Sequence, residues 1–491
     1  MENILSELEP KQVFYYFEEI CRIPHGSGNM KAISDYCAEF ARKHQLEYYQ
    51  DEAMNVVIKK PATKGYETLP TLMIQGHMDM VCEKNSDIIF DFDKDGIKLV
   101  VENGYIHADN TTLGGDDGIA VAICLSILED NQLAHPDLEI VLTTEEETGM
   151  DGAIYLRTDD LKSRYLLNLD SEDEGHILSG SAGGLKARAV LPVEYTRLEG
   201  YCTNIRITGL KGGHSGMEIQ QYRANANVLM GRLLLRLHKF LNFGIIHASG
   251  GLKDNAIPRE AFLRLVLQPE DIQRFTELFE GFYGEIQHEF SAKDPDISFE
   301  IDNKKVMETY DVLNPPSMEK FIYLLFNSPN GIQTMSPTLK GLPESSLNLG
   351  IIKCNEDSME FCWSVRSSVK SLKEHIADKL QYTTELMGGA FIVEGNYPEW
   401  EYRPHSKFRA LLMDVYEEMY SKPAIVETIH AGVECGIFAE KIPGIDIVSI
   451  GPDMEDIHTP KERLSIESVR RTYAYVCRIL EKFKDISSMN E

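Results

Sequence analysis

The chain has 491 residues, of which 43% are hydrophobic and 26% charged, so it is long enough for two or more globular domains. Its 78 acidic residues outnumber 49 basic ones, and the net charge of −29 excludes nucleic acid and membrane surfaces as expected partners. Residues 1–20 lack the features of a secretory signal and the nine cysteines form no CxxC pair, so we expect a cytoplasmic protein with reduced thiols.

The first 186 residues have the pattern of an α/β domain. We expect helices within 11–45, strands at 55–59 and 71–75, a helix at 117–130, and strands at 138–143 and 165–170. The runs TLMIQ and LEIVLTT are apolar on both faces, which is typical of central strands in a sheet that helices cover. A glycine-rich stretch at 180–184 then interrupts this pattern, and we interpret it as a hinge.

From residue 187 to residue 393 the predicted elements follow an α+β order. We expect strands at 203–208, 243–248, 261–267, 297–301, 346–352, 359–365 and 390–393, with helices at 218–239, 269–290, 318–325 and 372–387. Two halves of similar make-up indicate an internal duplication, with DNAIP (254–258) and SLNLG (346–350) at comparable places.

An α/β pattern returns after Pro398, with predicted helices at 408–420 and 466–483 and strands at 424–428 and 445–450. The expected architecture is therefore a discontinuous α/β domain, 1–186 and 394–491, with a mixed sheet flanked by helices. The duplicated α+β block, 187–393, is inserted into it as a lid domain.

Acid and histidine motifs stand at several strand ends. They are GHMDM (76–80), LGGDDGIA (113–120), TTEEETGM (143–150), LNLDSEDEG (167–175) and DIHTPKE (456–462). Each alone has an ordinary explanation, such as a turn or helix cap for the aspartates and a solvated face for the glutamates. Together they can converge on one sheet edge, where burying so many acids without a cation is costly. The sequence therefore predicts a site for divalent metal ions.

The motif set HxD, GGDDG, EExG, a strand-end LD and a C-terminal His before Thr-Pro resembles the co-catalytic zinc peptidases. That family includes glutamate carboxypeptidases, aminoacylases, acetylornithine deacetylase and carnosinase-type dipeptidases, and the resemblance extends over essentially the whole chain. RIPHGSGN (22–29), GGHSG (212–216) and HAGVECG (430–436) are most similar to the aminoacyl-histidine (Xaa-His) dipeptidases within it.

The resemblance implies two divalent metal ions, expected to be Zn²⁺, although Mn²⁺ and Co²⁺ also suit such ligands. It implies that His77 and Asp170 hold one ion, that Glu147 and His458 hold the other, and that Asp116 bridges them.

The resemblance also implies catalytic roles. Asp79 would orient His77, and Glu146 would be the general base that takes a proton from the hydroxide-forming water between the ions. In the lid, His214 would stabilise the tetrahedral oxyanion.

Three residues are expected to contact the substrate. Asn255 and Arg366 would hold its C-terminal carboxylate, for which a guanidinium offers two parallel donors. Glu434 is a candidate acceptor for a free ammonium group.

The expected function is metal-dependent hydrolysis of short peptides, and the favoured activity is that of a dipeptidase of the Xaa-His or β-Ala-His type. Two alternatives stay open: an N-acyl-amino-acid deacylase of the same fold, and a metal-binding scaffold without turnover. The resemblance implies a homodimer, but a lid of double size could supply His214 within one chain, so the oligomeric state stays open.

Overall fold

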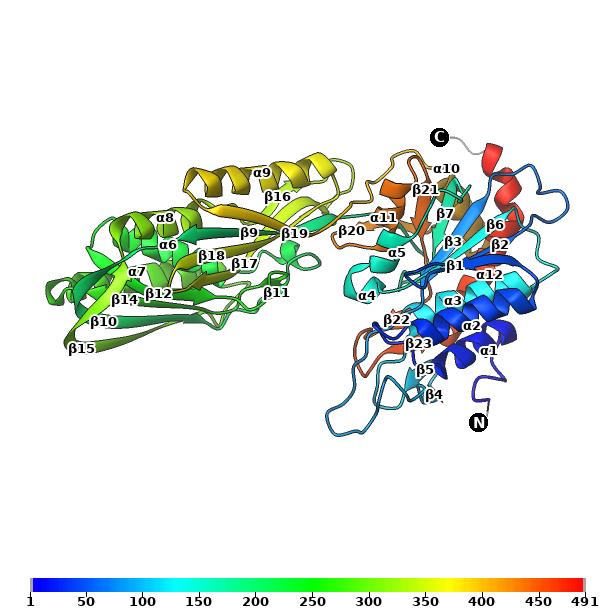
Figure 1. Ribbon diagram of the computed structural model, residues 1–491, viewed down its shortest axis with the longest axis horizontal. Helices are drawn as coiled ribbons and strands as arrows, with labels where there is room; N and C mark the ends of the chain where they lie inside the picture. The colour runs from blue at the N-terminus through cyan, green and yellow to red at the C-terminus, as the bar shows by residue number, and fades with distance from the viewer. Residues whose placement is uncertain (1–2, 489–491) are drawn as a thin grey trace. The chain divides into compact units, whose positions relative to one another are not determined.

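The computed structural model describes residues 3–488, which form two compact units (Figure 1). The first unit contains the residues up to Ser181, Trp400–Thr428, and the residues from Val433 onward. The second contains Ala182–Glu399 and Ile429–Gly432. These boundaries differ by a few residues from the expected ones at 186 and 394. The reason is that the first strand of the second unit begins at Gly183 and its last strand ends at Tyr397, close to the two points where the chain passes between the units. The short return of 429–432 to the second unit was not expected.

The first unit is built on an eight-stranded sheet. Its strands are, in spatial order, β1 (Glu47–Gln50), β2 (Val56–Lys60), β6 (Leu138–Thr143), β3 (Leu72–His77), β7 (Tyr165–Asn168), β21 (Asp446–Ser449), β8 (His176–Ser181) and β20 (Ile425–Ile429). The four strands β6, β3, β7 and β21 run parallel. Every residue of β3 and β6 is buried. Since parallel strands end at one edge, the segments that follow β3, β6 and β7 meet there.

Helices cover this sheet. They are α1 (Lys11–Cys21), α2 (Lys31–Lys43), α3 (Gly115–Glu129), α4 (Glu146–Gly149), α5 (Asp151–Tyr155), α10 (Lys407–Tyr420), α11 (Glu434–Lys441) and α12 (Ile466–Lys482). Helix α3 packs against both β3 and α1, and it is buried almost throughout because its IAVAICLSIL run is apolar on every side. A small antiparallel sheet joins β4 (Leu99–Glu102), β5 (Tyr105–Ala108), β22 (Met454–Glu455) and β23 (Arg463–Ser465).

The second unit is built on a nine-stranded sheet. Its strands are, in spatial order, β15 (Ser298–Leu313), β10 (Tyr195–Thr208), β14 (Ala261–Leu267), β12 (Phe243–Gly250), β17 (Pro343–Cys354), β18 (Ser358–Ser367), β9 (Gly183–Pro192) and β19 (Ala390–Tyr397), with β16 (Gly331–Met335) paired to β17. Its helices are α6 (Ala226–His238), α7 (Ile272–Phe290), α8 (Pro315–Asn327) and α9 (Lys370–Leu386). Figure 1 shows these helices gathered over the sheet, and their apolar sides form one core with it.

The expected duplication is visible in the topology of this sheet. The orders β10-α6-β12-β14-α7-β15 and β9-α8-β17-β18-α9-β19 are both βαββαβ units. In space the strands run β15-β10-β14-β12 in one half and β17-β18-β9-β19 in the other, which is the same arrangement reversed, and the halves meet where β12 pairs with β17. The expected equivalence of two motifs is wrong, however, because SLNLG lies inside β17, whereas DNAIP begins in the loop after β12 and includes the short strand β13 (Ala256–Ile257).

Two further observations concern the chain's surroundings. Between residues 3 and 488, no helix has both the length and the apolar character needed to cross a bilayer. The nine cysteines are all free thiols.

Candidate active site

The carboxyl edge of the first unit's sheet collects the predicted ligands. His77 is the last residue of β3, Glu147 follows β6 in the short helix α4, and Asp170 follows β7. Asp116 lies in the first turn of α3, and His458 lies in the loop between β22 and β23. Five residues that are far apart in the chain are therefore brought to one place by the sheet topology.

The carboxylate of Asp116 lies between two histidines. Its Oδ1 is 3.1 Å from His77 Nε2, and its Oδ2 is 3.1 Å from His458 Nε2. His77 Nε2 is also 3.5 Å from Asp170 Oδ1, and His458 Nε2 is 2.9 Å from Glu147 Oε1. The donors thus form two groups that share Asp116, and within each group the ligand atoms lie within 4.8 Å of one another.

Burial disfavours the charged form of several carboxyl groups of this site, whereas for Asp116 the hydrogen bonds with His458 and His77 outweigh burial and lower its pKa. Burial raises the pKa of Asp170 to about 6, although His77 acts in the opposite direction. Burial, with the nearby Asp170 charge, also raises the pKa of Asp117 and of Glu146 well above their usual values. Divalent cations would offset this repulsion, and mixed imidazole and carboxylate donors are suitable ligands for them. The residues therefore fit a pair of divalent cations.

The same carboxylates act on the two histidines. Hydrogen bonds to Asp116 and Glu147 raise the pKa of His458 to about 10. Burial lowers the pKa of His77, but Asp170 and Asp116 outweigh it and raise that pKa well above its usual value. Cations that bind here must displace these protons, so binding releases protons and weakens as the pH falls.

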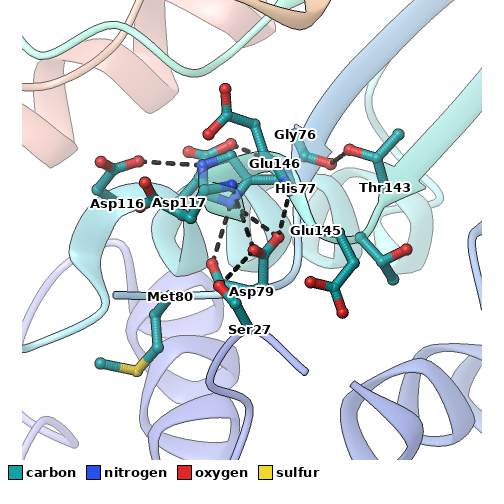
Figure 2. Close-up of polar contacts among 12 residues, drawn as sticks. Ser27, Gly76, His77, Asp79, Met80, Asp116, Asp117, Thr143, Glu145 and Glu146 are labelled. Atoms are coloured by element: carbon teal, nitrogen blue, oxygen red, sulfur yellow. Dashed lines mark hydrogen bonds and ion pairs between the residues drawn. The ribbon is translucent and has the colours of Figure 1, made fainter. Parts of the chain in front are cut away.

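Asp79 holds more than the imidazole that the motif assigns to it (Figure 2). His77 Nδ1 lies 3.0 Å from the backbone oxygen of Asp79 and 3.5 Å from its Oδ1. The Asp79 carboxylate accepts the backbone N–H groups of Glu146 at 3.1 Å and Glu147 at 3.3 Å, and the Ser27 hydroxyl at 2.8 Å. It therefore fixes the turn that carries both glutamates as well as the ring of His77.

Glu462 is an anchor that the motif analysis left without a role. Its side chain is buried, with 3% of its surface exposed. Its carboxylate accepts four consecutive backbone N–H groups: Leu113 at 2.7 Å, Gly114 at 3.3 Å, Gly115 at 2.8 Å and Asp116 at 3.4 Å. The loop that carries His458 is thereby tied to the loop that carries Asp116. The available signal was an acid four residues after a ligand histidine in DIHTPKE.

Glu434, the candidate acceptor for a substrate ammonium group, has both its hydrogen-bonded oxygen and its surface inside the first unit. It is fully buried, and its Oε2 accepts hydrogen bonds from Gln75 Nε2 at 2.6 Å and Thr143 Oγ1 at 2.7 Å. Burial raises the pKa of Glu434 to about 8. The predicted contact with a substrate ammonium does not fit this position, because no surface of Glu434 is open.

In the second unit, His214 and Arg366 meet at Gly216. A Cβ atom at Gly216 would lie 3.1 Å from His214 Cε1, 3.0 Å from Arg366 Nε and 2.6 Å from the backbone oxygen of His430. Arg366 is largely buried, its Nη1 donates to Tyr397 Oη at 2.9 Å, and its Nε has no partner among the described residues. A buried guanidinium N–H without a partner in residues 3–488 therefore lies close to the same glycine as the imidazole of His214.

The hydrogen bonds of His214 select one tautomer. Its Nδ1 accepts the backbone N–H groups of Gly216 at 3.3 Å and Met217 at 3.0 Å. Burial and the charge of Arg366 lower the pKa of His214, which favours the neutral ring. A neutral imidazole with an acceptor at Nδ1 carries its proton on Nε2, so His214 is a donor there. Asn255 stands beside this turn, since β11 (Gly213–His214) pairs with β13 (Ala256–Ile257).

Comparison with known proteins identifies the family of the chain. Residues 73–482 match the model of peptidase family M20/M25/M40, and the chain belongs to that family. It is therefore a hydrolase that acts on peptide bonds.

Two relatives resemble it over their full length. The cytosol non-specific dipeptidase of Escherichia coli K12 is 34% identical over 480 residues, which cover 97% of this chain and 99% of the relative. The aminoacylhistidine dipeptidase of Vibrio alginolyticus is 34% identical in sequence, and its crystal structure matches this one with a TM-score of 0.92 over 100% of this chain and 99% of that one. An aminopeptidase from Bacillus cereus shares the fold, with a TM-score of 0.56 at 16% identity over 97% of this chain and 99% of that one.

Proposed function

We propose that the protein is a cytoplasmic dipeptidase that uses two divalent cations, with Zn²⁺ as the proposed metal. Its proposed substrates are unblocked dipeptides, including those with a C-terminal histidine. The observation that carries this proposal is the Asp116 carboxylate, which presents one oxygen to His77 and the other to His458. Asp170 and Glu147 complete the two groups. The two relatives at 34% identity carry the names of a cytosolic and an aminoacylhistidine dipeptidase, and they support the substrate class.

When bound, the cations would supply Lewis acidity, which lowers the pKa of water and polarises a carbonyl. Glu146 is the proposed general base. Its backbone is fixed by Asp79, and burial raises its pKa, so its carboxyl can hold a proton taken from the attacking water and pass it to the leaving amine. Glu147, one residue further, is left to serve as a ligand.

The second unit supplies the proposed substrate contacts. His214 donates from Nε2 to the oxyanion that develops as the carbonyl is attacked, which its neutral tautomer permits. Arg366 and Asn255 hold the C-terminal carboxylate of the substrate. Such contacts would favour peptides with a free C-terminal carboxylate over blocked ones.

An assay of three substrate types tests this proposal. β-Alanyl-histidine, plain dipeptides and an N-acetyl amino acid are each supplied to the purified protein before chelation, after chelation, and after Zn²⁺ or Mn²⁺ is restored. Hydrolysis of the dipeptides that is lost and regained with the metal supports the dipeptidase. Hydrolysis of the acetylated amino acid alone favours the deacylase, and no turnover in any metal-loaded state favours the scaffold.

A further inference from the structure

The SLNLG motif of strand β17 contacts the loop that carries Asn255. Asn348 of this motif is buried, with 1% of its surface exposed. Its Nδ2 donates to the backbone oxygens of Asp254 and Ala256, each at 2.9 Å. These are the carbonyl groups on either side of Asn255. One amide group of β17 therefore holds the backbone before and after a residue to which we assign a substrate contact.

The remaining carbonyl of this loop is fixed by the turn of His214. The backbone oxygen of Asn255 accepts the N–H of Ser215 at 2.9 Å, and His214 lies opposite Ala256 in the short β11–β13 pair. Three consecutive carbonyl oxygens, 254 to 256, are thus bonded, while the side chain of Asn255 stays exposed. A shift of the loop would move Asn255 and His214 together.

The orientation of the Asn348 amide is itself determined. Its Oδ1 accepts Asn225 Nδ2 at 3.1 Å. Asn225 in turn caps helix α6, since its Oδ1 accepts the N–H groups of Asn227 at 2.9 Å and Val228 at 3.2 Å. With its oxygen committed to Asn225, the amide of Asn348 can present only its two N–H donors to the loop.

The loop of residues 251–256 contains no buried hydrophobic side chain. Leu252, two residues before Asp254, is 96% exposed. Gly251 and Gly350 bring the loop and β17 so close that a Cβ at Gly251 would overlap the Gly350 oxygen, and one at Gly350 would overlap the Asp254 oxygen. The shape of the loop is therefore set by polar bonds and close backbone contact.

We propose that Asn348 is a positioning residue that places Asn255 and His214 for the substrate's carboxylate and its scissile bond. This inference rests on the proposed function, because Asn255 and His214 have their roles from it. Asn348 itself does not touch the substrate in this account, and its effect passes through the two carbonyl oxygens that it binds.

Asn348→Asp is the matched perturbation, since it keeps the shape of the side chain and the acceptor for Asn225 but replaces both donors to the loop with an oxygen. Asn330→Asp is its control. Asn330 belongs to the same network through its Oδ1, which accepts the N–H of Leu349 at 2.9 Å, and it makes no bond to the loop. Both variants add one negative charge to the same network, and only Asn348→Asp removes the donors to the loop.

The measurement is kcat and KM for an unblocked dipeptide and for the same dipeptide with a C-terminal amide. We expect Asn348→Asp to lower kcat/KM for the free acid about 10- to 100-fold, with a raised KM, and to reduce the preference for acid over amide. Asn330→Asp should keep the wild-type preference. An unchanged acid-to-amide ratio in Asn348→Asp would overturn the proposal.

Two additions keep the test decisive. If Asn348→Asp does not fold, Asn348→Ser, which keeps one donor, takes its place with the same expectation. In an Asn255→Ala background, the Asn348 substitution should cause no further loss of the acid preference, and full additivity would contradict the proposal. If the wild type shows no acid preference, the proposed carboxylate contacts fail first, and that outcome is seen before any Asn348 variant is made.

Discussion

Substitution of Glu462 by glutamine replaces one of its two acceptor oxygens with an NH₂ group and hardly changes the volume of the side chain. In the structure each carboxylate oxygen of Glu462 accepts two of the four N–H groups: one oxygen takes Leu113 and Gly114, and the other takes Gly115 and Asp116. A glutamine keeps one oxygen and turns an NH₂ group toward the other pair. Two buried N–H groups then lose a charged acceptor.

The magnitude follows from these bonds. A hydrogen bond to a charged group contributes about 1.5–3 kcal/mol, and one bond in each pair, at 3.3 or 3.4 Å, is weak. We therefore expect Glu462→Gln to lower the free energy of unfolding by about 2–4 kcal/mol. These N–H groups belong to the turn that carries Asp116, so the turn should hold the Asp116 carboxylate less firmly. The affinity for the cations should therefore also fall, by about 10- to 100-fold.

Glu139→Gln is the matched control. Glu139, near the start of β6, is another buried carboxylate that accepts backbone N–H groups, from Lys162 at 3.0 Å and Ser163 at 3.1 Å. Urea denaturation and Zn²⁺ or Co²⁺ titration of both variants separate stability from metal affinity. We expect both to be less stable and only Glu462→Gln to bind cations more weakly. Wild-type metal affinity in Glu462→Gln would refute the argument that this anchor shapes the site.

Three further predictions follow from the site. Glu146→Gln should lower kcat by about 10²–10⁴-fold while metal content stays at the wild-type level, measured by steady-state kinetics and elemental analysis. Gly216→Ala should lower kcat/KM at least about tenfold without loss of metal, because the new methyl group meets His214, Arg366 and the His430 oxygen, whereas Gly281→Ala, with nothing within 4 Å, should not. Burial, with Arg366 and His214, lowers the pKa of His430 to about 4. Between about pH 6.5 and pH 4 this histidine is therefore protonated in the unfolded chain but not in the folded one, so the free energy of unfolding falls by up to about 3 kcal/mol as the pH drops through this range. In His430→Gln, urea denaturation should show a smaller fall over the same range.

A metal site could be predicted from the sequence because acid and histidine motifs follow several apolar strands, whereas the assignment of its five proposed ligands came from the family resemblance. Glu147, for example, lies three residues after the run LEIVLTT (138–144), and the ends of parallel strands meet at one edge of a sheet. The fold class could be predicted for the same reason. Short buried strands alternate with helices on both sides of the inserted block, and the family model and the full-length relatives agree with that reading.

The supporting residues could not be predicted in this way. Glu462 binds backbone groups of residues 113–116, and Asn348 binds backbone oxygens of the 254–256 loop. These partners are distant in the sequence, so a local motif such as DIHTPKE does not identify them. Glu434 was named as a candidate acceptor for a substrate ammonium group, but its side chain is buried and accepts hydrogen bonds from Gln75 and Thr143. The comparison of DNAIP with SLNLG failed because a short string carries no information on its place in the strand.

The most direct test of the central claim is a titration of the metal-free protein with Zn²⁺, in which bound metal and hydrolysis of an unblocked dipeptide are measured on the same samples. The account predicts two tightly bound ions per chain, dipeptide hydrolysis that requires them, and the loss of one or both ions in Asp116→Ala. Full activity without metal, or two ions bound to wild type and Asp116→Ala with equal affinity, would contradict the claim that Asp116 joins two cations at the centre of a peptidase.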